Sequence, residues 1–454
     1  MSHHTLELTP SDLIFFRDGR PMEGSATGNG AAWPLPNVLS SAIHHALRRA
    51  AHRDVHGHTP KRSGQILAAS RERQFGSLQS AGPFPVDEAG RWLFPRPADA
   101  QSARSAKTTH RPVAARIAGA VSSLPGDLKP VVAAIPPSKD TPEPWISCEA
   151  FEAYLRGSDP EGSGHFLKDE RLFGAEHHIG IGIDPFSGTQ DGEQFYSAAY
   201  LRLRENVRLG LVAACMDKGR EGKAADTDLI AATFPNSGRK TSILAGGQQR
   251  TCSVTRHTPG RLPLPVAPDI HGTRVRWTLL TPAIFPKIPE NREKQVVRHS
   301  GGWLPTWIDS GMGIQLKDSE ASCRQPGEGR EAWRRRVAGL PAIQARLVAA
   351  VIPKPIPVTG WALHDTDDSN GRLSAAGGAR ATHLAVPAGA VYYFECETEA
   401  GAKALAAALN WHGTTQGSSI ENRRSTLVGE KGFGLGVCSN WSFHNSDIRE
   451  HLRA

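Results

Sequence analysis

A chain of 454 residues is too long for one hydrophobic core and predicts two or three domains. Its hydrophobic content of 39% and charged content of 22% are typical of a soluble globular protein, and no run approaches the roughly 20 apolar residues that a membrane helix requires. The net charge of +8 does not select a fold, but it suits a polyanionic partner such as RNA, DNA or an acidic membrane, with a merely basic cytosolic protein as the equal alternative.

The cysteines and the N-terminus indicate the cellular compartment. Six cysteines are scattered singly, without a CxxC pair or a local Cys/His ligand pair, which argues against a zinc finger and against a disulfide framework. The start Met1-Ser2-His3-His4 lacks the charged beginning and apolar stretch of a signal peptide. We therefore expect a cytoplasmic protein with no bound metal and no cofactor.

The first half of the chain is predicted to alternate strands with short helices. A strand is expected within 6–16, and Asn37 is expected to cap a helix from 38 to about 51 whose basic face carries Arg48 and Arg49. Ser147 is predicted to open a second helix that Gly157 ends. Strands are expected over 179–183, 194–203, 210–214 and 251–255. Residues 53–145 show no clear order, and 101–110 has the composition of a mobile loop.

The second half repeats this alternation after a proline-dense linker at 259–268. A strand is predicted from 274 to 280, a helical stretch over 331–350 broken at Pro341, a strand over 391–396 and a helix over 400–409. Each half thus offers a strand, a helix and further strands. The predicted fold class is α+β, with two ferredoxin-like domains at 1–268 and 269–454 and an insertion around 53–145 in the first.

The run from Gly429 to Val437 has glycines at a spacing of two or three near the C-terminus. Its glycines leave backbone N–H groups accessible, and Phe433 offers a flat ring. The loop therefore suits a phosphate chain with a base stacked nearby, although a glycine-rich hairpin without a ligand is commoner across proteins in general. Neither the P-loop pattern nor the dinucleotide-binding fingerprint is met. The predicted RNA contacts here are Arg423, Arg424, Lys431, Gly432, Phe433, Gly434 and Gly436.

Other basic residues accompany turns upstream. Arg17 and Arg20 flank the turn after the first strand, and Arg239-Lys240 precede the turn Gly246-Gly247-Gln248-Gln249-Arg250. Exposed amides at that turn, together with Arg250, are expected to hold a phosphodiester. Several such sites along one chain predict a surface that follows an RNA backbone, whereas separate solvated turns are the alternative at each site.

The catalytic and metal-binding candidates are weaker. His177 and His178 are adjacent, so on a strand they point to opposite faces and at most one can serve in RNA cleavage. His52, His56 and His58 lie in a loop without a fourth ligand nearby, and the acidic run 365–371 lacks the glutamate of a calcium loop. We expect no catalytic residue and no metal ligand.

Several segments in order along the chain resemble one known family. The run from Leu13 to Pro21, followed by Pro34-Leu35-Pro36 and a helix, is similar to the opening of the third-subunit family of Cmr complexes, which are RAMP-superfamily subunits of type III-B CRISPR effectors. The resemblance covers most of the chain except roughly 53–145 and 310–350. It continues through 180–184, 192–196, the 246–250 turn, 280–285, 302–305, 360–361, 386–389 and the terminal glycine loop.

This resemblance implies two ferredoxin-like domains and a subunit without catalysis of its own. It implies binding of the 5′ repeat-derived tag of the crRNA and docking to the large polymerase/cyclase-like subunit and a RAMP backbone subunit. Target RNA would be met through the complex, with no membrane involved. Gln248 stands where many RAMP proteins have an acidic residue. A metal-independent endoribonuclease using His177 or His178, and a mainly structural subunit, are the alternative functions.

Overall fold

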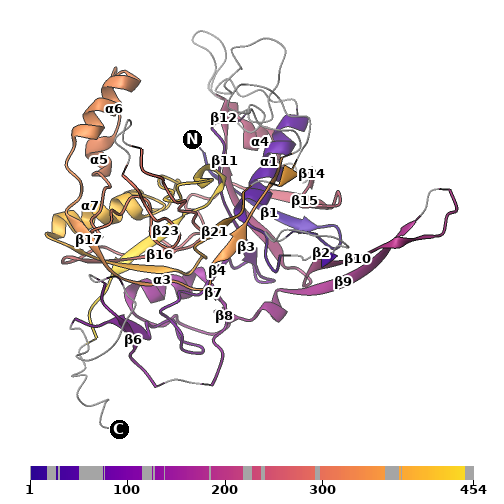
Figure 1. Cartoon of the computed structure of the whole chain (residues 1–454), viewed down its shortest axis with the longest axis horizontal. Helices are drawn as coiled ribbons and strands as arrows, with labels where there is room; N and C mark the ends of the chain where they lie inside the picture. The colour runs from indigo at the N-terminus through magenta and orange to yellow at the C-terminus, as the bar shows by residue number, and fades with distance from the viewer. Residues whose placement is uncertain are drawn as a thin grey trace.

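The computed structural model describes residues 2–17, 27–28, 31–50, 75, 77–114, 125, 128–136, 139–183, 186–217, 227–236, 241–291, 297–362, 378–379 and 381–444. Its elements form two main sheets with a long hairpin extending from one side (Figure 1). None of the described helices has the length and apolar character needed to cross a bilayer.

The elements of residues 4–257 are β1 (His4–Pro10), β2 (Thr27–Gly28), α1 (Pro36–Arg49), β3 (Gln79–Val86), β4 (Leu93–Pro95), β5 (His110–Pro112), β6 (Val131–Ala133), β7 (Trp145–Ser147), α3 (Cys148–Arg156), β8 (Phe166–Leu167), η1 (Asp169–Arg171), β9 (Phe173–Ile183), β10 (Gln190–Leu203), β11 (Arg208–Ala214), β12 (Met216–Asp217), β13 (Thr227–Asp228), α4 (Leu229–Thr233), β14 (Thr241–Leu244) and β15 (Thr251–His257). Those that follow are β16 (Arg274–Leu279), α5 (Ser319–Ser322), α6 (Arg330–Gly339), β17 (Ala345–Val351), β18 (Ile356–Val358), β19 (Trp361–Ala362), β20 (Gly378–Ala379), β21 (His383–Ala385), β22 (Val391–Cys396), α7 (Glu399–Leu409), η2 (Gly429–Lys431) and β23 (Gly436–Asn440).

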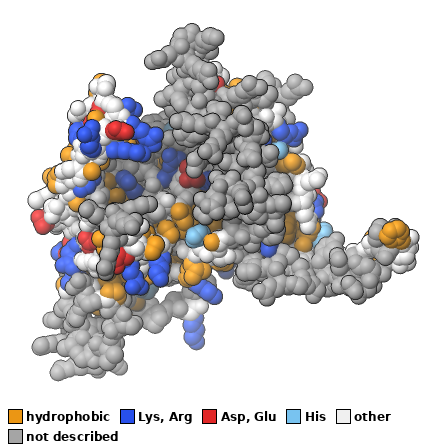
Figure 2. Space-filling view, turned by 45° about the horizontal axis from the view of Figure 1, so that its top comes forward, with side chains coloured by type: hydrophobic (Ala, Val, Ile, Leu, Met, Phe, Trp, Pro, Cys, Tyr) orange, Lys and Arg blue, Asp and Glu red, His pale blue; other side chains and the backbone are white. Residues whose placement is uncertain are grey.

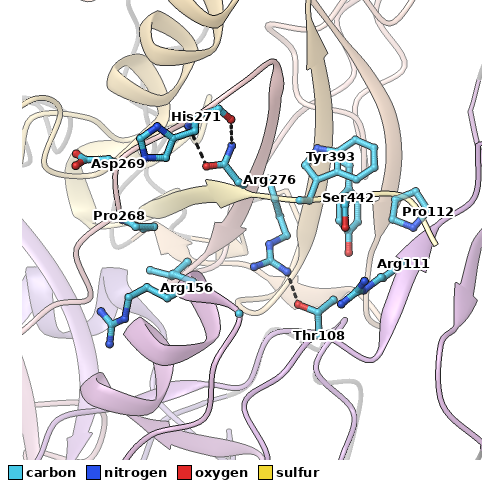
Figure 3. A pocket seen from close by; sticks show the side chains of 14 residues that line it. Thr108, Arg111, Pro112, Arg156, Pro268, Asp269, His271, Arg276, Tyr393 and Ser442 are labelled. Carbon is cyan, nitrogen blue, oxygen red and sulfur yellow. Dashed lines mark hydrogen bonds between the residues drawn. The ribbon is translucent and has the colours of Figure 1, made fainter. Parts of the chain in front are cut away.

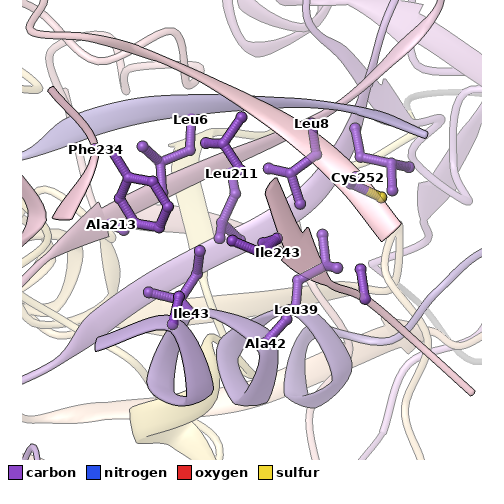
Figure 4. Packing of buried hydrophobic residues seen from close by; sticks show 14 of the residues in the cluster. Leu6, Leu8, Leu39, Ala42, Ile43, Leu211, Ala213, Phe234, Ile243 and Cys252 are labelled. Carbon is purple, nitrogen blue, oxygen red and sulfur yellow. The ribbon is translucent and has the colours of Figure 1, made fainter. Parts of the chain in front are cut away.

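The N-terminal sheet has the order β14-β15-β1-β11-β3, and all neighbouring strands are antiparallel. Alternate residues of β1, such as Leu6 and Leu8, point to one face, where they meet Leu39 and Ile43 of α1 (Figure 4). Phe234, just after α4, closes the same core. One face of this sheet is therefore covered by helices from its own half of the chain.

The C-terminal sheet has the order β17-β22-β16-β23, again with antiparallel neighbours. Val275, Trp277 and Phe394 on one face pack against α7. The small residues of α7 let it approach the sheet closely, and its N-cap Thr398 accepts a hydrogen bond from the N–H of Gly401. The two sheets share one arrangement. The strand that comes first in the chain, β1 or β16, lies between the third, β11 or β22, and the last, β15 or β23.

The other face of the C-terminal sheet is covered by described residues of the first half between 93 and 160. The backbone N–H of Lys129 donates to the carbonyl of Val348 at 2.7 Å, and that of Ala98 donates to Gly389 at 2.8 Å. Phe151 and Tyr154 of α3 pack in the same hydrophobic cluster as Val437. Residues 53–145 were expected to show no clear order, and 101–110 to be a mobile loop. The described residues of 93–145, including 101–110, are instead held against a sheet that lies far away in the sequence.

An ion pair lies at the centre of this contact. Arg276 of β16 and Asp99 are both buried, and their closest polar atoms are 3.1 Å apart. Tyr154 and Tyr393 each donate a hydroxyl hydrogen bond to Asp99, at 2.8 and 2.7 Å. Burial raises the pKa of both tyrosines, so they remain hydrogen-bond donors at neutral pH.

Local signals predicted several elements correctly. Ser147 caps α3 by accepting from the N–H of Ala150 at 3.1 Å, and Gly157 ends it with a φ of 75°. The predicted cap at Asn37 is wrong, because α1 begins at Pro36 and Leu35 is the N-cap. The helical pattern predicted after Pro341 is also wrong, since 345–351 forms β17 as an edge strand.

The proline-dense run at 259–268 is packed rather than extended between two bodies. Leu262 and Leu264 are buried in the hydrophobic cluster that contains Phe84 of β3 and Leu280, which follows β16. Residues from both halves therefore share one core. The division at 268 stays a prediction.

Candidate nucleic-acid interface

The Gly246 turn connects β14 to β15 and lies against the end of the first sequence motif. The N–H of Gly247 donates to the carbonyl of Phe15 at 2.8 Å, and the N–H of Ala245 donates to Arg250 at 2.9 Å. Gly246 has a φ of 83°, and a Cβ there would lie 2.5 Å from the oxygen of Phe15. The glycine at 246 is thus required by close packing inside the protein.

The same turn presents unpaired backbone donors to solvent. Gln248 and Gln249 adopt φ values of 55° and 54°, which is the left-handed region that side chains other than glycine rarely occupy. Among the described residues, the N–H groups of Gly246, Gln248 and Gln249 have no hydrogen-bond partner, and all three residues are exposed. Successive amides in such a conformation form a concave site that favours an anion.

An aromatic and a cationic side chain lie beside these amides. The guanidinium carbon of Arg250 is 5.0 Å from the ring centre of Tyr200, and the buried Nε of Arg250 has no partner among the described residues. Tyr200 donates its hydroxyl hydrogen to the side-chain oxygen of Gln248, and its ring centre is 5.5 Å from that of Phe15. We call Phe15, Tyr200, Gln248 and Arg250 the Tyr200 cluster.

Most of the charge on the neighbouring strand is neutralised locally. Glu176 of β9 accepts from Arg202 Nε at 2.6 Å and lies 2.8 Å from His178 Nε2. These hydrogen bonds, that from Arg202 first, lower the pKa of Glu176 to about 2. Arg202 also lies 3.5 Å from Asp12. Arg202 is therefore committed to two carboxylates, whereas Arg250 has no ion pair with any residue of the described chain.

The other predicted basic residues do not all lie near the Gly246 turn. Arg17 is exposed and follows Phe16, whose ring lies against Gly246, so it belongs to the same region as the Tyr200 cluster. Arg48 and Arg49 are exposed at the C-terminal end of α1, where positive charge also complements the helix dipole, and neither bonds to the Gly246 turn. Arg20, Arg239 and Lys240 lie outside the described residues.

The terminal glycine loop is buried from Gly432 to Val437. Phe433 is 0% exposed and packs with Ile284, Val358 and Ala385. The expectation that a base stacks on Phe433 is therefore wrong for this structure, because the ring has no face open to solvent. A glycine-rich sequence is compatible with both situations, and only the surroundings distinguish them.

The glycines of this loop are explained by close packing. A Cβ on Gly432, whose φ is 94°, would lie 2.8 Å from the oxygen of Ser80 in β3 of the other sheet. A Cβ on Gly434 would overlap the backbone nitrogen of Ser425, and one on Gly436 would overlap the indole of Trp277. The loop therefore joins the two halves of the molecule, with η2 lying against β3 and α1.

The arginines before this loop are also occupied or partly buried. Arg424 Nε donates to the carbonyl of Ala408 at 2.6 Å, and burial lowers the pKa of its guanidinium to about 10. Burial likewise lowers the pKa of Arg423. Lys431 lies in η2 and is half-buried. Their RNA contact stays a prediction.

The sequence prediction missed Tyr200 and the shape of the strands around it. β9 and β10 form a long antiparallel hairpin that extends from the body to the right of Figure 1. Tyr200 lies at the base of this hairpin, where its ring centre is 4.8 Å from that of His178. The available signal was the alternation of 194–203, which predicts a strand but not its neighbours.

No metal centre is found among the described residues, where no group of three His, Cys, Asp or Glu side chains is placed to hold an ion. The histidines at 52, 56 and 58 and the acidic run 365–371 lie outside the part that the structure describes. His177 and His178 are both exposed on β9.

A family model described as CRISPR-associated protein (Cas_Cmr3) matches residues 6–441. No curated protein matches the chain. A cryo-EM structure of the Type III-B Cmr-beta bound to cognate target RNA and AMPPnP has 10% identity and a TM-score of 0.35, covering 88% of this chain and 86% of that chain. A second Cmr-beta structure bound to cognate target RNA has 12% identity and a TM-score of 0.35, covering 86% of each chain. A crystal structure of a Csm1-Csm4 cassette in complex with AMPPNP has 10% identity and a TM-score of 0.27, covering 68% of this chain and 93% of that chain.

Proposed function

Since the chain belongs to the Cas_Cmr3 family of CRISPR-associated proteins and is thus a subunit of a type III effector complex, we propose that it binds the guide RNA of that complex without cleaving it. The proposed contact is the 5′ tag of the crRNA. Target RNA is then met through the assembled complex, in the cytoplasm, in defence against viruses and plasmids. The alternative is the metal-independent cleavage of repeat RNA at His177 or His178.

The observation that carries the proposal is the Tyr200 cluster with its turn. Three exposed amides without partners in the described chain, the partly buried Arg250 and the exposed Arg17 together offer donors and positive charge for a phosphodiester. The ring of Tyr200 lies beneath Arg250. These groups recognise a backbone rather than a base sequence, as expected of a protein that holds a constant RNA segment.

We propose in addition that both halves are ferredoxin-like RAMP domains. Support comes from the order β17-β22-β16-β23 and from the matching order β15-β1-β11-β3, with a helix before the last strand in each. In both sheets the helices cover one face. The opposite face of the C-terminal sheet is covered by described residues between 93 and 160, so we do not expect RNA to bind there.

Docking to the large polymerase/cyclase-like subunit and to a RAMP backbone subunit is also proposed. The β9–β10 hairpin supports it, because Ile179, Ile181 and Ile183 share one face and are 69%, 46% and 64% exposed. Figure 2 shows hydrophobic side chains at the far end of this hairpin. An apolar row on a protruding element marks an interaction site.

Arg250→Glu is expected to weaken binding of single-stranded crRNA about tenfold or more, because a charge-assisted hydrogen bond contributes about 1.5–3 kcal/mol. The slope of the logarithm of affinity against the logarithm of salt concentration should become shallower by about 0.7 for each phosphate that the protein no longer neutralises. Fluorescence anisotropy of labelled crRNA at several salt concentrations measures both quantities.

Arg335→Glu, on the exposed surface of α6, is the matched charge reversal and should leave the affinity near the wild-type value. Equal decreases in affinity in the two variants would show that the Gly246 turn is not a specific part of the RNA-binding surface. Incubating the repeat RNA with the protein in EDTA addresses the alternative. Cleavage that disappears in His178→Ala would show an endoribonuclease.

Replacing Ile179 and Ile183 together by serine is expected to reduce incorporation of the chain into the effector complex several-fold. Both side chains are more than half exposed, so the free chain should keep its thermal midpoint within about 1 °C, as expected of surface substitutions of less than about 0.5 kcal/mol. Co-purification with the other subunits, quantified by mass spectrometry, measures incorporation.

Ile135→Ser serves as the control, because Ile135 is 42% exposed and does not lie on the hairpin. Unchanged incorporation of the hairpin variant would argue that the isoleucine row has no protein neighbour.

A further inference from the structure

The outer edge of β9 is open. β9 is the last strand in the order β2-β10-β9, and among the described strands none pairs with its other side. The strand is 11 residues long, and Figure 1 shows it extending away from the body with β10. A long, unpaired strand edge presents a row of N–H and C=O groups to the backbone of another chain.

The hydrogen bonds of β10 show which residues of β9 face this edge. The N–H and C=O of Leu201 both bond to Ile14, at 2.8 and 3.0 Å, so they point away from β9. Leu201 and the opposite residue, Ala175, are therefore a pair without mutual hydrogen bonds. Such pairs alternate along an antiparallel ladder, and the register is continuous over 173–181. The residues of β9 that direct their N–H and C=O outward are thus Ala175, His177, Ile179 and Ile181.

The same residues carry the exposed apolar side chains of the hairpin. Ile179 and Ile181 lie on one face of β9, and both are exposed. Edge strands are commonly protected by lysine or proline, and the sequence of β9 contains neither. Its acidic residue, Glu176, is already bound by Arg202 and His178. Nothing in the sequence of β9 therefore protects this edge from pairing with another strand.

The edges of the C-terminal sheet are treated differently, because the chain itself covers them. Residues 312–314 lie along β17, and the N–H of Lys129 donates to the carbonyl of Val348 at 2.7 Å. At the other edge, β23 ends at Asn440, whose side-chain amide exchanges two hydrogen bonds with the backbone of His271. These are the dashed lines at His271 in Figure 3. The open edge of β9 differs from both.

We propose that a strand from a neighbouring subunit of the effector complex pairs with the outer edge of β9. The partner is an extended segment with apolar side chains at every second position, which meet the isoleucine row. A row of alternating N–H and C=O groups matches a peptide backbone, whereas the oxygens of a phosphate backbone only accept hydrogen bonds. This inference rests on the proposed docking of the hairpin and specifies the kind of contact that it makes.

Amide hydrogen exchange at single-residue resolution tests the proposal, on the full chain alone and in the assembled effector complex. The amides of His177 and Ile179 should exchange at least about tenfold more slowly in the complex, because they become hydrogen-bonded. Those of Glu176 and His178 should change less, because they already bond to β10. Unchanged exchange at His177 and Ile179 would overturn strand pairing. If the serine variant of the isoleucine row still lost incorporation, docking of the hairpin would stand without it.

Ala175→Pro and Ala175→Ser form a matched pair of variants. Proline removes an outward N–H and serine keeps it, while neither removes a bond between β9 and β10. Incorporation into the complex should fall about threefold or more for the proline variant and stay near the wild type for the serine variant.

Equal incorporation of the two variants would contradict the proposal. Slow exchange at His177 and Ile179 in the concentrated free chain would identify a second copy as the occupant. Slow exchange after adding crRNA alone would identify RNA. Either result would overturn the assignment to a neighbouring subunit.

Discussion

Arg276→Leu is expected to lower the free energy of unfolding by about 3–5 kcal/mol, one of the two largest effects predicted for this chain. The substitution leaves Asp99 buried without its cation, at 0% exposure. It also removes the donors that hold Ser439 and the carbonyl of Tyr154. A charge without a partner in such an interior must be protonated or the contact must open.

The measurement is the midpoint of denaturant-induced unfolding, followed by tryptophan fluorescence because Trp277 and Trp441 lie in or after the strands concerned. Arg274→Ala is the control on the same strand. Arg274 lies 3.3 Å from Glu395 at the surface, where an ion pair contributes about 1 kcal/mol or less. An Arg276→Leu midpoint as close to the wild type as that of Arg274→Ala would contradict the prediction.

A second substitution should restore part of the stability. Asp99→Asn keeps an acceptor for Tyr154 and removes the unpaired charge, so Arg276→Leu combined with Asp99→Asn should be more stable than Arg276→Leu alone. A double variant that is less stable than both single variants would show that the unpaired charge of Asp99 is not the source of the destabilisation.

Gly434→Ala is expected to destabilise the chain by about 3 kcal/mol or more. A left-handed residue with a side chain costs about 1–2 kcal/mol, and forcing a Cβ into an occupied space costs about 1–3 kcal/mol more. Gly434 has a φ of 77°, and its Cβ would overlap the backbone of Ser425, which cannot turn away as a flexible side chain would. Thermal unfolding of the purified variant measures the destabilisation.

Gly429→Ala is the control within the same loop. A Cβ there would lie 3.8 Å from that of Arg423, so the change should cost less than about 0.5 kcal/mol. The pair also separates packing from RNA contact. If the loop packs the two halves together, Gly429→Ala keeps full crRNA affinity, whereas an amide cradle for phosphate would bind more weakly on gaining a methyl group at its open edge.

The elements that were predicted correctly are those specified by local helix caps and by strand alternation. Ser147 and Gly157 bound α3 as expected, because an N-cap hydroxyl and a left-handed C-terminal glycine act over three or four residues. The strand expected at 391–396 is β22 with the same limits. The predicted α+β class follows from these elements, and the family resemblance is confirmed by the match over 6–441.

The candidate site was predicted in part. Gly246, Gly247 and Arg250 do lie in one turn beside a cation, as the turn residues indicated, and among the described residues its amides at Gly246, Gln248 and Gln249 have no partner. Tyr200 was missed because it is 48 residues from Gln248, whose side chain it contacts. Strand alternation tells which residues share a face, but it does not tell which loop from another strand lies over that face.

The sequence by itself determined short-range features, such as the cap of α3 and the alternation of β22, and the family to which the chain belongs. Tertiary structure alone decided the surroundings of the glycine loop and of the described residues between 93 and 160. Glycine permits both an open anion site and a close backbone contact, and the choice depends on whether an atom such as the oxygen of Ser80 lies 2.8 Å from the missing Cβ of Gly432. Likewise, Asp99 and Arg276 are 177 residues apart, and their pairing follows from the sheet that brings both into one buried space.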